Sequence, residues 1–218
     1  MKKGVVLKMK KWERIEGRAI YNMGKNGGRI TESRENIEIA RKAAAEGMVL
    51  LKNQKNVLPI QNGEGVALFG IGSADYIKGG EGSGDVITRY VMQPVDVFEK
   101  ASEDGRVNIY KPLHDFYRAS AKQQHDNGHR TGYTFEPEIT DGMVENSAKE
   151  CTTALIFLGR ISTENDDITQ NEYCLSCTEK SLIDKVSEVF PKTIVILNNV
   201  AVMDLSYIAN NKKIGGIE

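Results

Sequence analysis

The sequence predicts an α/β fold in which a mainly parallel sheet is sandwiched between helices. Three short apolar runs, residues 66–70, 153–158 and 193–197, have the length and β-branched content of strands buried on both faces. Segments with helical spacing of apolar residues separate these runs along the chain. Strands that alternate with helices are typical of parallel sheets covered on both sides, because parallel strands need crossover connections.

The remaining elements follow in chain order. Residues 1–32 have no sustained periodicity and are expected to form an arm or linker, whereas 33–218 are expected to form one sandwich domain. Ser33 is expected to cap a helix over 34–47, where apolar residues recur at helical spacing. Further along we expect a turn at 53–56, a helix at 94–101, a strand at 107–110, a helix at 114–124, an excursion over 125–137, a helix capped by Asp141 and running to 149, a helix beginning at Ser176, and a short strand at 214–217.

Composition and charge limit the functional classes. The chain has 218 residues, of which 40% are hydrophobic, enough for a sizeable core. The formal net charge of −1 argues against nucleic acid or an anionic membrane as a partner. A lysine cluster near the N-terminus lacks the apolar core and cleavage site of a signal peptide, and no segment reaches membrane-spanning length. We therefore expect a soluble, cytoplasmic protein without a membrane partner.

The cysteines indicate structural rather than metal-binding roles. Their odd number favours a reducing compartment. Cys174 and Cys177 have C-x-x-C spacing, but a second ligand pair is missing. Ser176 and Glu179 have the spacing of a capping box, which puts Cys177 in the first turn of a helix. His125 and His129 lie in a polar stretch without acidic or cysteine partners at ligand spacing, so we expect surface histidines and no metal site.

Two glycine-rich turns are candidates for ligand contact. Gly70 and Gly72 follow a strand, as in a dinucleotide-binding turn, but Asp75 stands at the third glycine position and would repel a pyrophosphate. Residues 79–84 allow a backbone to approach a ligand closely or simply make a tight loop, and together with Lys78 they are called the glycine loop. The glycine loop has no Walker lysine after its glycines.

The strand over 153–158 is expected to end at Gly159 and to enter an acidic loop, residues 160–167. Ligands of open α/β sheets bind outside the carboxyl ends of the strands. This loop places Glu164, Asp166 and Asp167 near Arg160, and such carboxyl clusters are typical of general acid/base sites because neighbouring charges separate their pKa values. A solvated acidic loop explains the same residues, and their chemistry alone leaves both interpretations open.

Five segments in this order resemble the α/β sandwich domain of family-three glycoside hydrolases, the β-glucosidase family, over residues 33–218. They are residues 40–53 with 57–60, residues 66–70, residues 78–84, Gly159-Arg160 with Glu164 and Asp167, and residues 190–197. The resemblance implies that Glu164 is the catalytic acid/base. It also implies that the sugar pocket includes Lys78, Gly79, Gly80, Glu81, Gly82, Ser83, Arg160 and Asp167.

The sequence departs from the family pattern beside the catalytic position. Thr163 stands where the family usually has glycine, and Ile168 stands where many members have arginine. These departures leave Asp166 and Asp167 open as alternative acids. They also make the chain most similar to the subgroup in which the sandwich domain precedes the catalytic barrel domain.

The resemblance implies retaining hydrolysis of a β-glucoside or related oligosaccharide, without a cofactor or metal. The nucleophile of the family is an aspartate on a (β/α)-barrel, so we expect a barrel domain as the partner. We expect this chain to be a piece that stops before the last elements of the sandwich and is inactive alone. The alternatives are a noncatalytic carbohydrate-binding or scaffold domain and a flavodoxin-like nucleotide-binding domain. The sugar, the linkage and a homo-oligomeric state remain open.

Overall fold

In the computed structural model, the described residues are 33–218 without 87, 89, 165 and 166, and they belong to two units that divide after Met48. The predicted arm over 1–32 and the candidate acid Asp166 lie outside the described residues. In the first unit, helix α2 (Arg34–Gly47) begins as predicted, because the Ser33 side chain accepts a hydrogen bond from the backbone N–H of Asn36 at 3.1 Å. The second unit, 49–218, contains the sheet and the site described below.

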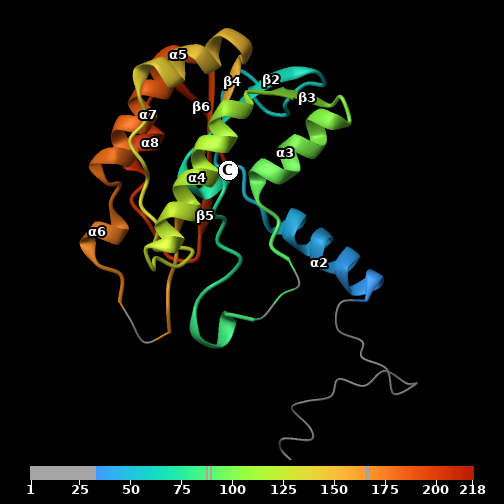
Figure 1. Ribbon diagram of the computed structural model, residues 1–218, viewed down its shortest axis with the longest axis vertical. Helices are drawn as coiled ribbons and strands as arrows, with labels where there is room; N and C mark the ends of the chain where they lie inside the picture. Colours follow the sequence, from blue (N-terminus) through green and yellow to red (C-terminus); the bar gives the residue numbers. More distant parts are fainter. Residues whose placement is uncertain (1–32, 87, 89, 165–166) are drawn as a thin grey trace, which may run out of the picture. The chain divides into compact units, whose positions relative to one another are not determined.

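Within the described residues, a six-stranded sheet has the order β1-β6-β5-β4-β2-β3 (Figure 1). Only the pair of β1 and β6 is antiparallel among these neighbours, so the predicted mainly parallel sheet is confirmed. The strands are β1 (Lys52–Asn53), β2 (Glu64–Phe69), β3 (Val107–Ile109), β4 (Thr153–Arg160), β5 (Lys192–Asn199) and β6 (Ile214–Ile217).

Helices cover the sheet on both faces, because the central strands are apolar on both. Along β4, Ala154, Ile156 and Leu158 face one core cluster, whereas Leu155 and Phe157 face the other. The first cluster packs under helices α4 (Lys111–Asp126), α5 (Asp141–Glu150), α7 (Cys177–Val189) and α8 (Ser206–Asn210). The second packs under α3 (Pro94–Glu103) and the segment at Val57. No described helix combines the length and hydropathy needed to cross a bilayer.

Several predicted boundaries are wrong for local reasons. Gly159 does not end β4, because it and Arg160 continue the pairing with β5. Thr140, not Asp141, caps α5, since its hydroxyl accepts from the N–H of Met143. Helix α4 begins earlier than predicted, with Pro112 in its first turn, where a missing N–H costs no hydrogen bond. The short helices α6 (Gln170–Tyr173) and α8 were not predicted, because two or fewer turns give no clear periodicity.

Candidate active site

The loops that follow β2 and β4 meet at the carboxyl edge of the sheet, at its lower end in Figure 1. Glu164 lies exposed in a turn of the acidic loop, and the Ser83 hydroxyl donates to its Oε2 at 3.4 Å. The backbone N–H of Glu81 donates to the carbonyl of Ser162 at 3.3 Å. The predicted position of Glu164, on a loop at the same edge as the glycine loop, is therefore confirmed.

Gly82 gives the glycine loop its backbone turn beside Glu164. Its φ of +68° lies in the left-handed region, and a Cβ there would lie 3.4 Å from Oε2 of Glu164. At the start of the same loop, the Nζ of Lys78 forms an ion pair with Asp85 at 2.9 Å, which closes the loop across its base. For Lys78 and the loop's glycines and serine, sugar binding stays a prediction.

Arg160 has a structural environment that the sequence did not reveal. Its Nη1 and Nη2 donate to the two carboxylate oxygens of Glu179, each at 2.8 Å. Its other N–H groups donate to the backbone carbonyls of Glu172, Gly159 and Cys174 at 2.6, 2.7 and 3.0 Å. All five N–H groups of the guanidinium therefore have protein acceptors. This arrangement favours a structural role for Arg160, in which its side chain holds the neighbouring backbone in place. It favours the predicted contact of Arg160 with a sugar less.

Glu179 extends this anchor into α7. Its Oε2 also accepts from the backbone N–H of Ser176 at 2.8 Å, and the Ser176 hydroxyl accepts from the N–H of Glu179 at 3.1 Å. The predicted capping box is confirmed, and Cys177 occupies the first turn of the helix as predicted. The acidic loop thus lies between the end of β4 and the capped helix α7, which are joined by the ion pair of Arg160 and Glu179.

The carboxylate of Glu81 is held by the excursion (residues 125–137). The Tyr133 hydroxyl donates to Oε2 at 2.9 Å, and the Nη1 of Arg130 pairs with Oε1 at 2.8 Å. Arg130 also lies over the Tyr133 ring, 5.2 Å from its centroid. Contact of Glu81 with a sugar stays a prediction. The Glu81 side chain is held by the excursion, to which the sequence assigned no function.

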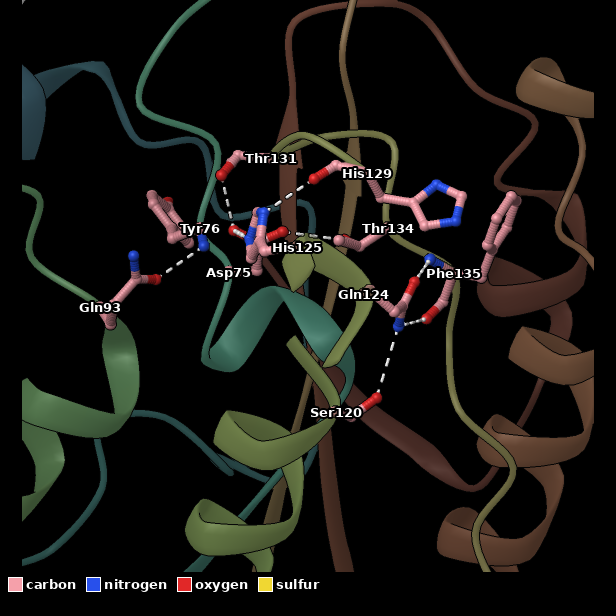
Figure 2. A network of polar contacts seen from close by, with 10 residues as sticks. All are labelled: Asp75, Tyr76, Gln93, Ser120, Gln124, His125, His129, Thr131, Thr134 and Phe135. Atoms are coloured by element: carbon pink, nitrogen blue, oxygen red, sulfur yellow. Dashed lines mark hydrogen bonds and ion pairs between the residues drawn. The ribbon is translucent and has the colours of Figure 1, made fainter. Parts of the chain in front are cut away.

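The excursion is itself anchored by Asp75 (Figure 2), and the Asp75 side chain is only 4% exposed. Thr131 and Thr134 donate to its Oδ1 and Oδ2 at 2.7 and 2.9 Å, and Nε2 of His125 lies 3.1 Å from Oδ1. Nδ1 of His125 lies 2.9 Å from the carbonyl of His129, which only accepts, so that nitrogen carries a proton. The expected surface histidine is therefore a partner of the buried aspartate.

Glu136 is a second carboxyl that sequence reasoning missed, and it is partly buried. Its Oε2 accepts from the backbone N–H of Ile71 at 2.7 Å, and the Tyr117 hydroxyl donates to Oε1 at 3.2 Å. Burial raises the pKa of Glu136 to about 8, and the nearby charge of Glu179 acts in the same direction. The side chain lines a cavity of about 410 Å³ that also includes Tyr133 and Arg160. No local sequence signal marked Asp75 or Glu136, because their partners are distant in the chain.

The other candidate residues contribute less to this constellation. Asp167 is exposed on the acidic loop, three residues after Glu164. Cys151 is buried, Cys174 is partly buried and Cys177 is exposed. Among the described residues, no group of three or more His, Cys, Asp or Glu side chains is arranged to hold a metal ion.

Comparison with known proteins places the chain in a family. Residues 48–217 match the family described as the glycosyl hydrolase family 3 C-terminal domain. The chain is 33% identical over 233 residues to β-glucosidase A of Butyrivibrio fibrisolvens, an alignment that covers 96% of this chain and 28% of the relative. A β-glucosidase of Ruminococcus albus is 30% identical over 183 residues, covering 80% of this chain and 19% of the relative.

Solved structures show the same relationship. A β-glucosidase from Paenibacillus barengoltzii superimposes with a TM-score of 0.75 at 28% identity, covering 85% of this chain and 21% of that chain. β-Glucosidase 3B from Thermotoga neapolitana in complex with glucose superimposes with a TM-score of 0.69 at 30% identity, covering 84% of this chain and 26% of that chain. The chain thus spans about a quarter of the length of these proteins. It belongs to glycosyl hydrolase family 3, and residues 48–217 form the C-terminal domain of that family.

Proposed function

We propose that the chain supplies the general acid/base, and part of the sugar pocket, of a retaining β-glucosidase. The observation that carries this proposal is the contact between Ser83 of the glycine loop and Glu164 of the acidic loop, 3.4 Å apart at the carboxyl edge of the sheet. Relatives that are named β-glucosidases support the reaction class. This chain spans about a quarter of their length, and we propose that the nucleophile lies outside it, on a (β/α)-barrel domain of the longer enzyme.

In this mechanism Glu164 acts twice. It first donates a proton to the glycosidic oxygen while the partner carboxylate attacks the anomeric carbon and forms a glycosyl-enzyme intermediate. The aglycone leaves as an alcohol, and the ionised Glu164 then takes a proton from a water molecule that attacks the intermediate. The exposure of Glu164 supports this role, because a carboxyl on the surface of this unit is accessible to a substrate held by a second domain.

The glycine loop supplies the sugar-facing wall. Its glycines bring backbone N–H and carbonyl groups within reach of sugar hydroxyls, and Ser83 offers a hydroxyl beside the acid/base. Proton transfer and covalent catalysis by carboxylates complete the reaction, so the mechanism that we propose uses no cofactor.

Replacement of the acid/base in the longer enzyme that contains this domain tests the proposal. Glu164→Gln should lower kcat for a natural β-glucoside on the order of 10²–10⁴-fold, because the amide has no proton to transfer. The matched control is Glu145→Gln, an exposed glutamate on α5, which should leave kcat unchanged. Equal activity of the two variants would remove Glu164 from the mechanism.

A further inference from the structure

Two segments that are distant from Glu81 in the sequence converge on it. Its carboxylate binds Tyr133 and Arg130 of the excursion at 2.9 and 2.8 Å, and its backbone N–H binds Ser162 of the acidic loop at 3.3 Å. The Glu81 side chain is only 19% exposed, whereas the side chain of its partner Arg130 is 72% exposed. Hydrogen bonds to an ionised carboxylate are stronger than those between neutral groups, and partial burial strengthens them further.

The excursion provides a rigid support for these contacts. Thr131 and Thr134, which flank Tyr133 closely in sequence, are tied to the buried Asp75 at 2.7 and 2.9 Å (Figure 2). Between them, Gly132 has a φ of +87° and lies so close to Ile161 that a Cβ would stand 2.7 Å from its Cδ1. The excursion is thus fixed on one side to the loop after β2 and on the other to the first residue after β4.

The contacts continue from Glu81 to the proposed acid/base. Two residues after Glu81, the Ser83 hydroxyl donates to Glu164. A displacement of Glu81 would therefore move Ser83 and the loop's backbone groups relative to Glu164. The path from Tyr133 to Glu164 runs through the Glu81 side chain and the glycine loop. Because three of the four residues from 79 to 82 are glycines, the loop backbone has little stiffness of its own.

We propose that Tyr133 and Arg130 are positioning residues, which hold the glycine loop against the acid/base through the carboxylate of Glu81. Their role in catalysis depends on the function proposed above, whereas their role in ordering the loop does not. The excursion is then the third wall of the site, beside the glycine loop and the acidic loop. The pKa of Tyr133 is raised by its hydrogen bond to Glu81, which agrees with a hydroxyl that donates to an ionised carboxylate.

Amide hydrogen exchange in the 218-residue chain tests the ordering of the loop. Tyr133→Phe keeps the ring and removes only the hydroxyl, so exchange in peptides over 79–86 should become at least several-fold faster, with β4 and β5 unchanged. Tyr207→Phe is a matched control, because the Tyr207 hydroxyl donates to a carboxylate oxygen of Asp184 at 2.7 Å on α7, away from this loop. It should not alter exchange over 79–86. Equal exchange rates over 79–86 in Tyr133→Phe and Tyr207→Phe would overturn the proposal.

Kinetics in the longer enzyme test the link to catalysis. Tyr133→Phe should lower kcat/KM for a natural β-glucoside, and the loss should disappear in a Glu81→Ala background, because Tyr133 acts through Glu81. Additive losses would mean that Tyr133 acts by another route and would overturn the proposal. An unchanged kcat/KM of Tyr133→Phe beside an inactive Glu164→Gln overturns the positioning role alone. Full activity of Glu164→Gln instead rejects the proposed function, and the exchange measurement still decides whether the excursion orders the loop.

Discussion

Arg160 and Glu179 pair through two parallel hydrogen bonds of 2.8 Å, which join the end of β4 to the first turn of α7. Both side chains are largely buried, at 12% and 11% exposure. The fork of the guanidinium matches the two carboxylate oxygens, and the three remaining N–H groups reach the carbonyls of Gly159 in β4, Glu172 in α6 and Cys174 just after α6. The segment after the acidic loop is therefore fixed by one side chain.

Arg160→Lys should destabilise the domain by about 2–4 kcal/mol, although the charge is kept. Lysine lacks the planar fork, so Glu179 would lose one of its two bonds and backbone carbonyls near α6 would lose their donors. Urea denaturation measures the free energy of unfolding. The control is Arg106→Lys, because Arg106 pairs with Asp104 where both side chains are more than half exposed, and such pairs contribute at most about 1 kcal/mol. Similar losses in the two variants would contradict the structural role of Arg160.

The position of Glu164 could be predicted from sequence, whereas the contacts around it could not. The apolar run over 153–158 identifies a buried strand, and a strand in a parallel sheet determines the edge at which its following loop lies. Such a pattern reports only which residues are buried. It does not say that Arg160 meets Glu179, 19 residues further on, or that Asp75 meets Thr134, 59 residues further on.

The same limit explains the wrong end of β4. Glycine usually interrupts a strand, but Gly159 is paired with Asn198, and a Cβ at position 159 would lie 3.0 Å from Ile77. The glycine leaves room for the loop packed on the strand, which is a tertiary contact. The excursion likewise has no periodicity, because beyond the end of α4 it forms neither helix nor strand and its side chains bond to distant residues such as Asp75 and Glu81.

Stability should depend on pH through Glu136. Its pKa is about 8 in the folded protein and 4.5 in the reference state, so between these values the folded state binds the additional proton. The free energy of unfolding should therefore fall as the pH rises from about 5 to 8, by at most about 1.4 kcal/mol per pH unit from this group. Below this window the contribution is fully present, and above it the contribution is lost.

Glu136→Gln should remove this dependence, because an amide does not titrate. Urea denaturation at pH 5, 6, 7 and 8 gives the difference in unfolding free energy between the variant and the parent protein, and this difference should change steadily across the series. Glu138→Gln, an exposed carboxyl two residues away, is the control and should give a constant difference. A constant difference for Glu136→Gln as well would mean that the Glu136 carboxyl is ionised throughout.

The 218-residue chain should not hydrolyse an aryl β-glucoside above the uncatalysed rate. Glu164 is an acid/base in our proposal, and without the partner carboxylate no glycosyl-enzyme intermediate forms. Release of the aryl group from the purified chain measures this, with the longer enzyme as the positive control. Steady turnover that Glu164→Gln abolishes would show that the nucleophile lies within this chain.

The choice of acid among Glu164, Asp166 and Asp167 can be decided by comparing leaving groups. Removal of the true acid should slow a natural β-glucoside far more than an activated aryl glucoside, because a good leaving group departs without protonation. Azide should then partly restore turnover of the activated substrate, since an anion attacks the intermediate without a general base. We expect this pattern for Glu164→Gln, whose side chain meets Ser83, and only small, substrate-independent losses for Asp166→Asn and Asp167→Asn. The same pattern in either aspartate variant, with an active Glu164→Gln enzyme, would transfer the role of acid to that aspartate.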